Sequence, residues 1–128
     1  MEWPNYNPKP AARFMLTLFA QAWDHMIDIL DQMEKEGRSH LICHVYYSEF
    51  VKNPLGTVGK IHNHFGLAPP SDSKMQSWLN DNPPGKHGSH SYSLAEFGIS
   101  DHEVYTSFRK YYLRFFPALL PSVYRSKL

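Results

Sequence analysis

Apolar residues recur at helical spacing along most of the chain, so the sequence predicts a mainly helical protein. In residues 11–36 they repeat every three or four positions, and Gly37 follows as a helix stop. The repeating residues are Phe19, Trp23, Met26, Ile27, Leu30 and Met33. We therefore expect one long amphipathic helix in this part of the chain.

Three further helices are predicted from the residues that cap them. Asn53, Ser71 and Ser100 each precede an apolar periodic segment, and such side chains accept hydrogen bonds from the first backbone N–H groups of a helix. Pro54 suits the first helical position, and Glu103 completes a capping box with Ser100. Residues that should end these helices are Gly66, Pro83 and Pro117.

Residues 41–47 form a short apolar run that is typical of a buried β-strand. One strand cannot pair its own backbone groups, so a neighbour must come from a second copy or from upstream strands of a larger α/β domain. The fold class expected from this strand is α/β. Cys43 lies inside the run, where a structural thiol is the favoured interpretation because an apolar strand disfavours the thiolate.

Composition limits the classes of partner. The 128 residues are 42% hydrophobic and 15% aromatic, which indicates one folded unit, and the net charge of +1 makes nucleic acid a poor default partner. We expect no signal peptide, because residues 1–10 carry Pro and Asn instead of a basic region followed by an apolar one. We also expect no membrane span, because no apolar run approaches roughly 20 residues. The expected compartment is the cytoplasm. The alternative is the peroxisome, from the tripeptide at residues 126–128, Ser-Lys-Leu.

The segment after Pro83 and Pro84 combines glycines with cationic side chains. Gly85 and Gly88 let a backbone approach an anion closely, and Lys86, His87 and His90 can donate charge-assisted hydrogen bonds to it. The segment is therefore a candidate phosphate site. The alternative is a solvated loop that binds nothing.

The chain contains eight histidines, but they lack the accompanying cysteines or carboxylates of a metal motif. We therefore predict no metal site.

Two ordered blocks resemble sulfotransferases that use 3'-phosphoadenosine 5'-phosphosulfate. Residues 45–55 and 61–67 are similar to the strand, turn and proline-started helix of that family, with Tyr-Ser-Glu-Phe where Tyr-Glu-Asp-Leu is usual. Residues 82–98 are similar to its late Lys-His-Gly and Tyr-Ser-Leu-Glu-Asp-Phe-Gly block. The resemblance covers residues 41–116. It implies that residues 1–128 are a single partial domain, the C-terminal, mainly helical portion of a P-loop-like three-layer α/β fold.

The resemblance also implies a nucleotide site. Tyr47 takes the place of the strand-end tyrosine beside the adenine, and Lys86, His87 and Gly88 take the place of the loop that holds the 3'-phosphate. His90 is a further candidate for the phosphate. The donor would be 3'-phosphoadenosine 5'-phosphosulfate, and the acceptor an unidentified hydroxyl or amine. Ser48 and Ala95 depart from the acidic residues usual in the family.

Other parts of the family's site have no counterpart in this sequence. They are the Gly/Ser/Thr-rich loop for the 5'-phosphosulfate, the upstream Arg and Ser, and the base for the acceptor. We assign no catalytic residue and expect the chain alone to be inactive. Two alternatives stay open: a non-enzymatic interaction module that pairs its open strand edge with another copy or a full-length relative, and a truncated gene product.

Overall fold

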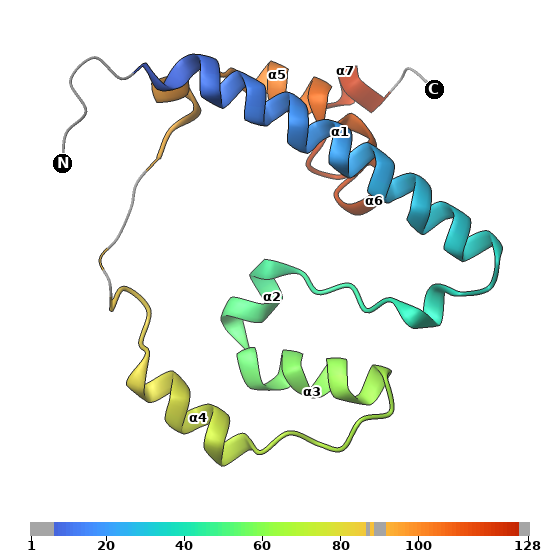
Figure 1. The fold of residues 1–128 in the computed structure, drawn as a ribbon, viewed down its shortest axis with the longest axis vertical. Helices are drawn as coiled ribbons and strands as arrows, with labels where there is room; N and C mark the ends of the chain where they lie inside the picture. The colour runs from blue at the N-terminus through green and yellow to red at the C-terminus, as the bar shows by residue number, and fades with distance from the viewer. Residues whose placement is uncertain (1–6, 87, 89–91, 126–128) are drawn as a thin grey trace. The chain divides into compact units, whose positions relative to one another are not determined.

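The computed structural model describes residues 7–86, 88 and 92–125, and these residues form helices without any strand (Figure 1). The α/β fold class is therefore wrong, because the described chain contains no sheet. The elements are α1 (Pro8–Lys35), η1 (Ser39–Leu41), α2 (Tyr47–Lys52), α3 (Pro54–His64), α4 (Asp72–Asp81), η2 (Leu94–Phe97), α5 (Asp101–Ser107), α6 (Arg109–Phe115) and α7 (Ser122–Arg125).

The predicted strand at residues 41–47 is the clearest correction. Ile42 and Tyr46 do have extended backbone, with φ and ψ of −124° and 130° and of −84° and 126°, but η1 includes Leu41 and α2 begins at Tyr47. Local preference is extended here, but a strand also needs a neighbour to pair with its N–H and C=O groups. No such neighbour lies among the described residues, so the segment is irregular.

The chain divides into two compact units, Met1–Gln32 with Ser91–Leu128, and Met33–His90. In the first unit α5 and α6 lie alongside α1 (Figure 1). The Trp23 ring of α1 packs edge-on against the Tyr111 ring of α6, with 4.7 Å between the ring centroids. Two ion pairs also join α6 to α1, and the first is Lys110 with Asp28. The second pair is Arg114 with Asp31. Hydrogen bonding to Asp28 raises the pKa of Lys110.

The long N-terminal helix is confirmed as α1, and its buried residues include Ile27 and Leu30. The capping box at Ser100 and Glu103 is also confirmed, but the single helix expected after it is interrupted at Phe108. Phe108 has φ −99° and ψ 22°, and it separates α5 from α6. Neither proline nor glycine stands at this break.

The second unit consists of α2, α3 and α4 with their connections. Asn53 Oδ1 accepts a hydrogen bond from Gly56 N at 3.0 Å, and Pro54 is the first residue of α3, as predicted. Gly66 follows the helix with φ +64°, a backbone conformation that suits glycine. Ser71 caps α4. These local predictions are confirmed because each depends on residues close together in sequence.

Within the described ranges, no helix combines the length and the apolar character needed to cross a bilayer.

Candidate functional site

Tyr47, the candidate adenine contact, is the first residue of α2, and 78% of it is exposed. No side-chain hydrogen bond or ring contact joins Tyr47 to another described residue. Tyr47 stands at the helix start because the preceding residue, Tyr46, is the N-cap. Tyr46 has extended backbone, and its carbonyl oxygen accepts hydrogen bonds from Glu49 N and Phe50 N. An exposed aromatic face of this kind can stack on a purine.

Lys86, the candidate phosphate contact, follows α4 and is tied to the end of that helix. Its Nζ donates to the Asp81 carbonyl oxygen at 2.6 Å and to Asn82 Oδ1 at 3.1 Å. A cation at a helix C-terminus is stabilised by the carbonyl groups that have no partner within the helix. An ammonium group has three N–H donors, so these two contacts leave one for another acceptor.

The glycines around Lys86 adopt the conformations that the loop interpretation requires. Gly85 has φ +79° and Gly88 has φ +93°, and beyond the chain neighbours no described atom lies within 4 Å of where a Cβ would stand at either position. The backbone is therefore approachable at both glycines. However, Lys86 N donates to Pro83 O at 3.1 Å and Gly88 N donates to Gly85 O at 2.9 Å, so these amides are already paired within the turn.

The remaining predicted contacts, His87 and His90, lie outside the described residues, and so does the tripeptide at 126–128. Tyr47 and Lys86 both belong to the unit Met33–His90, but no hydrogen bond or ring contact joins them. The described structure therefore presents two separate candidate contacts and does not assemble them into one pocket.

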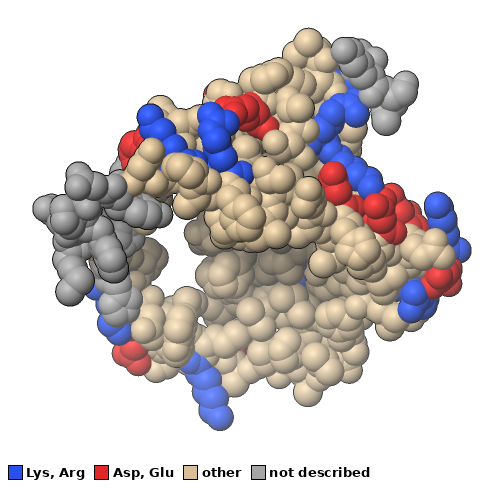
Figure 2. Space-filling view, turned by 45° about the horizontal axis from the view of Figure 1, so that its top comes forward, with Lys and Arg blue, Asp and Glu red and all other residues tan. Residues whose placement is uncertain are grey.

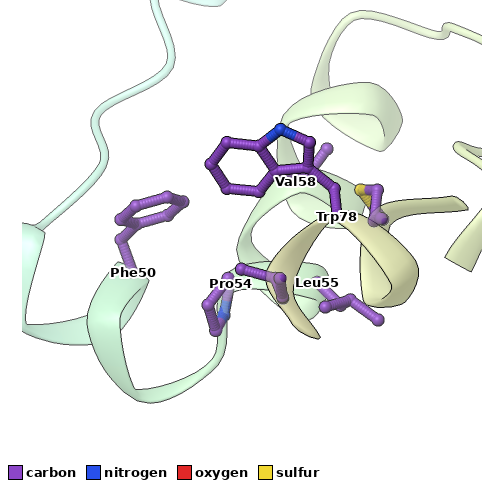
Figure 3. A pocket seen from close by; sticks show the side chains of 7 residues that line it. Phe50, Pro54, Leu55, Val58 and Trp78 are labelled. Carbon is purple, nitrogen blue, oxygen red and sulfur yellow. The ribbon is translucent and has the colours of Figure 1, made fainter. Parts of the chain in front are cut away.

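An apolar pocket of about 190 Å³ occurs where α2, α3 and α4 meet (Figure 3). Its lining residues are Phe50, Pro54, Leu55, Val58, Met75, Trp78 and Leu79. Trp78 is 63% exposed even though its ring borders this pocket. The apolar spacing in the sequence predicts that such residues line helix faces, but it does not indicate that the three helices leave a space between them. The pocket has no charged lining residue and cannot recognise a phosphate.

Charge is distributed in small groups of both signs. In the view of Figure 2, basic and acidic side chains lie next to one another, without a broad basic patch. In the second unit Lys60 pairs with Glu49 at 3.7 Å across α3 and α2. This distribution favours local anion contacts such as Lys86 over extended electrostatic attraction.

Histidines of the second unit contact backbone carbonyl oxygens. His62 Nδ1 lies 2.5 Å from Ala68 O, and His64 Nε2 lies 2.9 Å from His40 O. The structure shows no group of three or more His, Cys, Asp or Glu residues that could hold a metal ion within the part of the chain it describes. Cys43 is half-buried.

Comparison of the chain with protein-family models, with curated proteins and with solved structures finds no match. The resemblance to sulfotransferases therefore depends on the two motif blocks at residues 45–67 and 82–98 alone.

Proposed function

We propose that this chain is a sulfotransferase-like protein that binds the adenosine 3',5'-bisphosphate part of 3'-phosphoadenosine 5'-phosphosulfate and does not transfer the sulfuryl group on its own. Lys86 is the residue on which the proposal chiefly depends. Its ammonium group is held at the end of α4, it keeps one N–H donor, and glycines with positive φ stand at the preceding position and two positions later. In this proposal Lys86 contacts the 3'-phosphate and Tyr47 stacks on the adenine.

Transfer needs groups that position the donor and stabilise the bridging oxygen as charge develops there. No residue of this sequence matches the base that the resemblance implies for the acceptor hydroxyl. We therefore assign donor recognition alone to this chain. Transfer to a hydroxyl or amine requires another polypeptide segment that supplies the 5'-phosphosulfate contacts.

Calorimetric titration with adenosine 3',5'-bisphosphate tests the proposal, with adenosine 5'-monophosphate as the ligand that lacks the 3'-phosphate. Lys86→Ala should weaken binding of the bisphosphate about fivefold, because it removes the attraction between an exposed ammonium group and the phosphate, which is worth about 1 kcal/mol. The matched control is Lys74→Ala, which removes the same charge from an exposed position of α4. It should leave the affinity unchanged.

The adenine contact is tested separately. Tyr47→Ala should weaken both nucleotides about tenfold, since stacking on one base contributes roughly 1–3 kcal/mol, whereas Tyr47→Phe keeps the ring and should bind normally. Equal affinity of the chain for the two nucleotides would refute recognition of the 3'-phosphate. Circular dichroism of each variant establishes that the helices are intact.

The alternative function, a non-enzymatic interaction module, loses the strand edge as its contact because no strand forms in the described ranges. Among the described residues, such a contact would be made by helices or by the segments that connect them.

A further inference from the structure

Helix α1 carries two apolar faces, and one of them is covered within its own unit. Ala20, Ile27 and Leu30 are buried, and Trp23 packs against Tyr111 of α6. This first face accounts for the packing of α1 in the unit Met1–Gln32 with Ser91–Leu128.

The second face, which we call the outer seam, is exposed. Its large side chains are Phe14, Met15, Leu18, Phe19, Met26 and Ile29, each between 41% and 66% exposed. At 3.6 residues per turn, these positions fall within roughly 140° of the helix circumference. No Lys, Arg, Asp or Glu falls within that arc. A helix with an uncovered apolar face this long is typical of one that packs against a further partner.

The spacing of the outer seam indicates what kind of partner fits. Met15, Phe19, Ala22, Met26 and Ile29 follow one another at intervals of four, three, four and three residues. This is the heptad repeat of a helix that packs side by side with another helix of similar repeat. The described residues offer one such helix, which is α1 itself.

The outer seam is also nearly symmetric about Ala22. Met15 and Ile29 stand seven residues on either side of it, and Leu18 and Met26 stand four. In an antiparallel pair of α1 helices, Met15 of one copy would face Ile29 of the other, and Leu18 would face Met26. The small side chain of Ala22 at the centre allows the two backbones to approach. Such a contact is isologous, which is the usual form in homodimers.

The size of the outer seam is compatible with a stable contact. A large apolar side chain offers on the order of 200 Å², so six half-exposed side chains offer roughly 600 Å² per copy and roughly 1,200 Å² over two copies. Specific interfaces begin at about 1,200 Å². Residues flanking the seam on the 28-residue helix add to this area.

We propose that two copies of this chain associate as an antiparallel homodimer through the outer seams of their α1 helices. This contact is independent of nucleotide binding, because neither Tyr47 nor Lys86 takes part in it. It replaces the strand edge as the surface of self-association. The competing occupant is the unit Met33–His90 of the same chain, which also exposes apolar side chains.

Sedimentation velocity over a concentration series tests the proposal on the full chain. The unchanged chain should sediment at twice its mass of 14.9 kDa. Ala22→Glu should weaken dimerisation by roughly 100-fold or more, because the twofold axis brings the two introduced carboxylates together. The control Gln21→Glu adds the same charge at the neighbouring exposed position outside the seam and should dimerise normally. A monomer at all concentrations, or a dimer that Ala22→Glu leaves intact, would overturn the proposal.

Cross-linking keeps the proposal testable if Ala22→Glu disturbs folding. With Cys43→Ser as background, Met15→Cys and Ile29→Cys chains are made separately, mixed and oxidised. A covalent dimer that forms only in the mixture supports the antiparallel contact. Cross-linking of Met15→Cys with itself, or no cross-linking beyond that of a Gln21→Cys control, refutes it.

Discussion

Protonation of Glu103 should destabilise the first unit in acid, because this carboxylate is the centre of the contacts at the start of α5. Its Oε2 accepts from Ser100 N and from Ser100 Oγ, each at 2.9 Å, and its Oε1 pairs with Arg13 of α1. Arg13 also donates to Gly98 O at 2.7 Å. The Ser100 backbone N–H, followed by Arg13, lowers the pKa of Glu103 from 4.5 to about 2.

The sign of the effect follows from this pKa. The unfolded chain binds the proton near pH 4.5 and the folded chain only near pH 2, so between these values the unfolded state binds up to about one more proton. The contribution of Glu103 to stability is therefore complete above pH 4.5 and is lost as pH falls to about 2. Glu103→Gln can keep the contact with Ser100 N but loses the charge. The free energy of unfolding of Glu103→Gln should lie below that of the unchanged chain at neutral pH, and this difference should shrink as pH falls from 4.5 to about 2.

The size of the helix-cap contribution can be measured in parallel. Ser100→Ala removes the acceptor for Glu103 N, which lies 3.2 Å from Ser100 Oγ, and should lower the free energy of unfolding by about 1 kcal/mol. Urea unfolding followed by circular dichroism at several pH values gives both effects. Ser71→Ala is the control. Ser71 caps α4 by accepting a hydrogen bond from Lys74 N, and the third helical position there is Lys74 instead of a carboxylate, so the cost of this variant should not depend on a carboxylate.

Two results would contradict this role of Glu103. One is a Glu103 carboxyl that titrates near 4.5 by nuclear magnetic resonance. The other is a Glu103→Gln deficit that stays constant from neutral pH to pH 2.

Two further predictions concern glycine conformation and tyrosine ionisation. Gly98→Ala should destabilise the chain by about 1 kcal/mol, because Gly98 has φ +65° and Lys9 Cδ lies 3.2 Å from the added Cβ. Gly59→Ala within α3 should instead stabilise the chain by about 0.5–1 kcal/mol. Thermal unfolding of both variants checks that the two effects have opposite signs. Burial raises the pKa of Tyr112 above 10.0, so its contribution to stability is present below pH 10 and is lost as pH rises further. Tyr112→Phe should flatten that alkaline decline of the free energy of unfolding, measured in urea, and remove a phenolate absorbance transition above pH 10.

Helix starts could be predicted from the sequence because capping is a local interaction. Asn53 Oδ1 reaches Gly56 N, and Ser100 with Glu103 forms both hydrogen bonds of the capping box, each over three residues. Such contacts need no information about distant parts of the chain. The predicted strand was wrong for the opposite reason: extended backbone at Ile42 and Tyr46 becomes a strand only when another segment pairs with it.

The candidate site could be predicted only in part. Positive φ at Gly85 and Gly88 follows from the residue type. The contacts of Lys86 with Asp81 and Asn82 depend on how the turn after α4 folds back on the helix, and residue spacing alone does not reveal them. The double apolar periodicity of α1 was visible in part, since the predicted repeat already contained both Phe19 and Ile27, which lie on different faces.

The surroundings of Lys86 predict that its phosphate contact is weak and sensitive to salt. The C-terminus of α4 carries partial negative charge, which opposes an anion, and the amides of Lys86 and Gly88 are already paired. Among the described residues of this loop, one exposed ammonium group must therefore attract the phosphate almost alone. At a separation of about 4 Å in water this attraction is worth about 1 kcal/mol.

Raising the ionic strength to about 1 M, where the Debye length is about 3 Å, should therefore weaken binding of adenosine 3',5'-bisphosphate roughly fivefold. Binding of adenosine 5'-monophosphate should change less. In Lys86→Ala the two nucleotides should differ much less in their sensitivity to salt. Lys86→Arg should keep the greater salt sensitivity of the bisphosphate, because the charge is retained. Salt-independent recognition of the 3'-phosphate would mean that backbone amides, and not Lys86, hold it, and the turn between Pro83 and Gly88 would then have to open when the nucleotide binds.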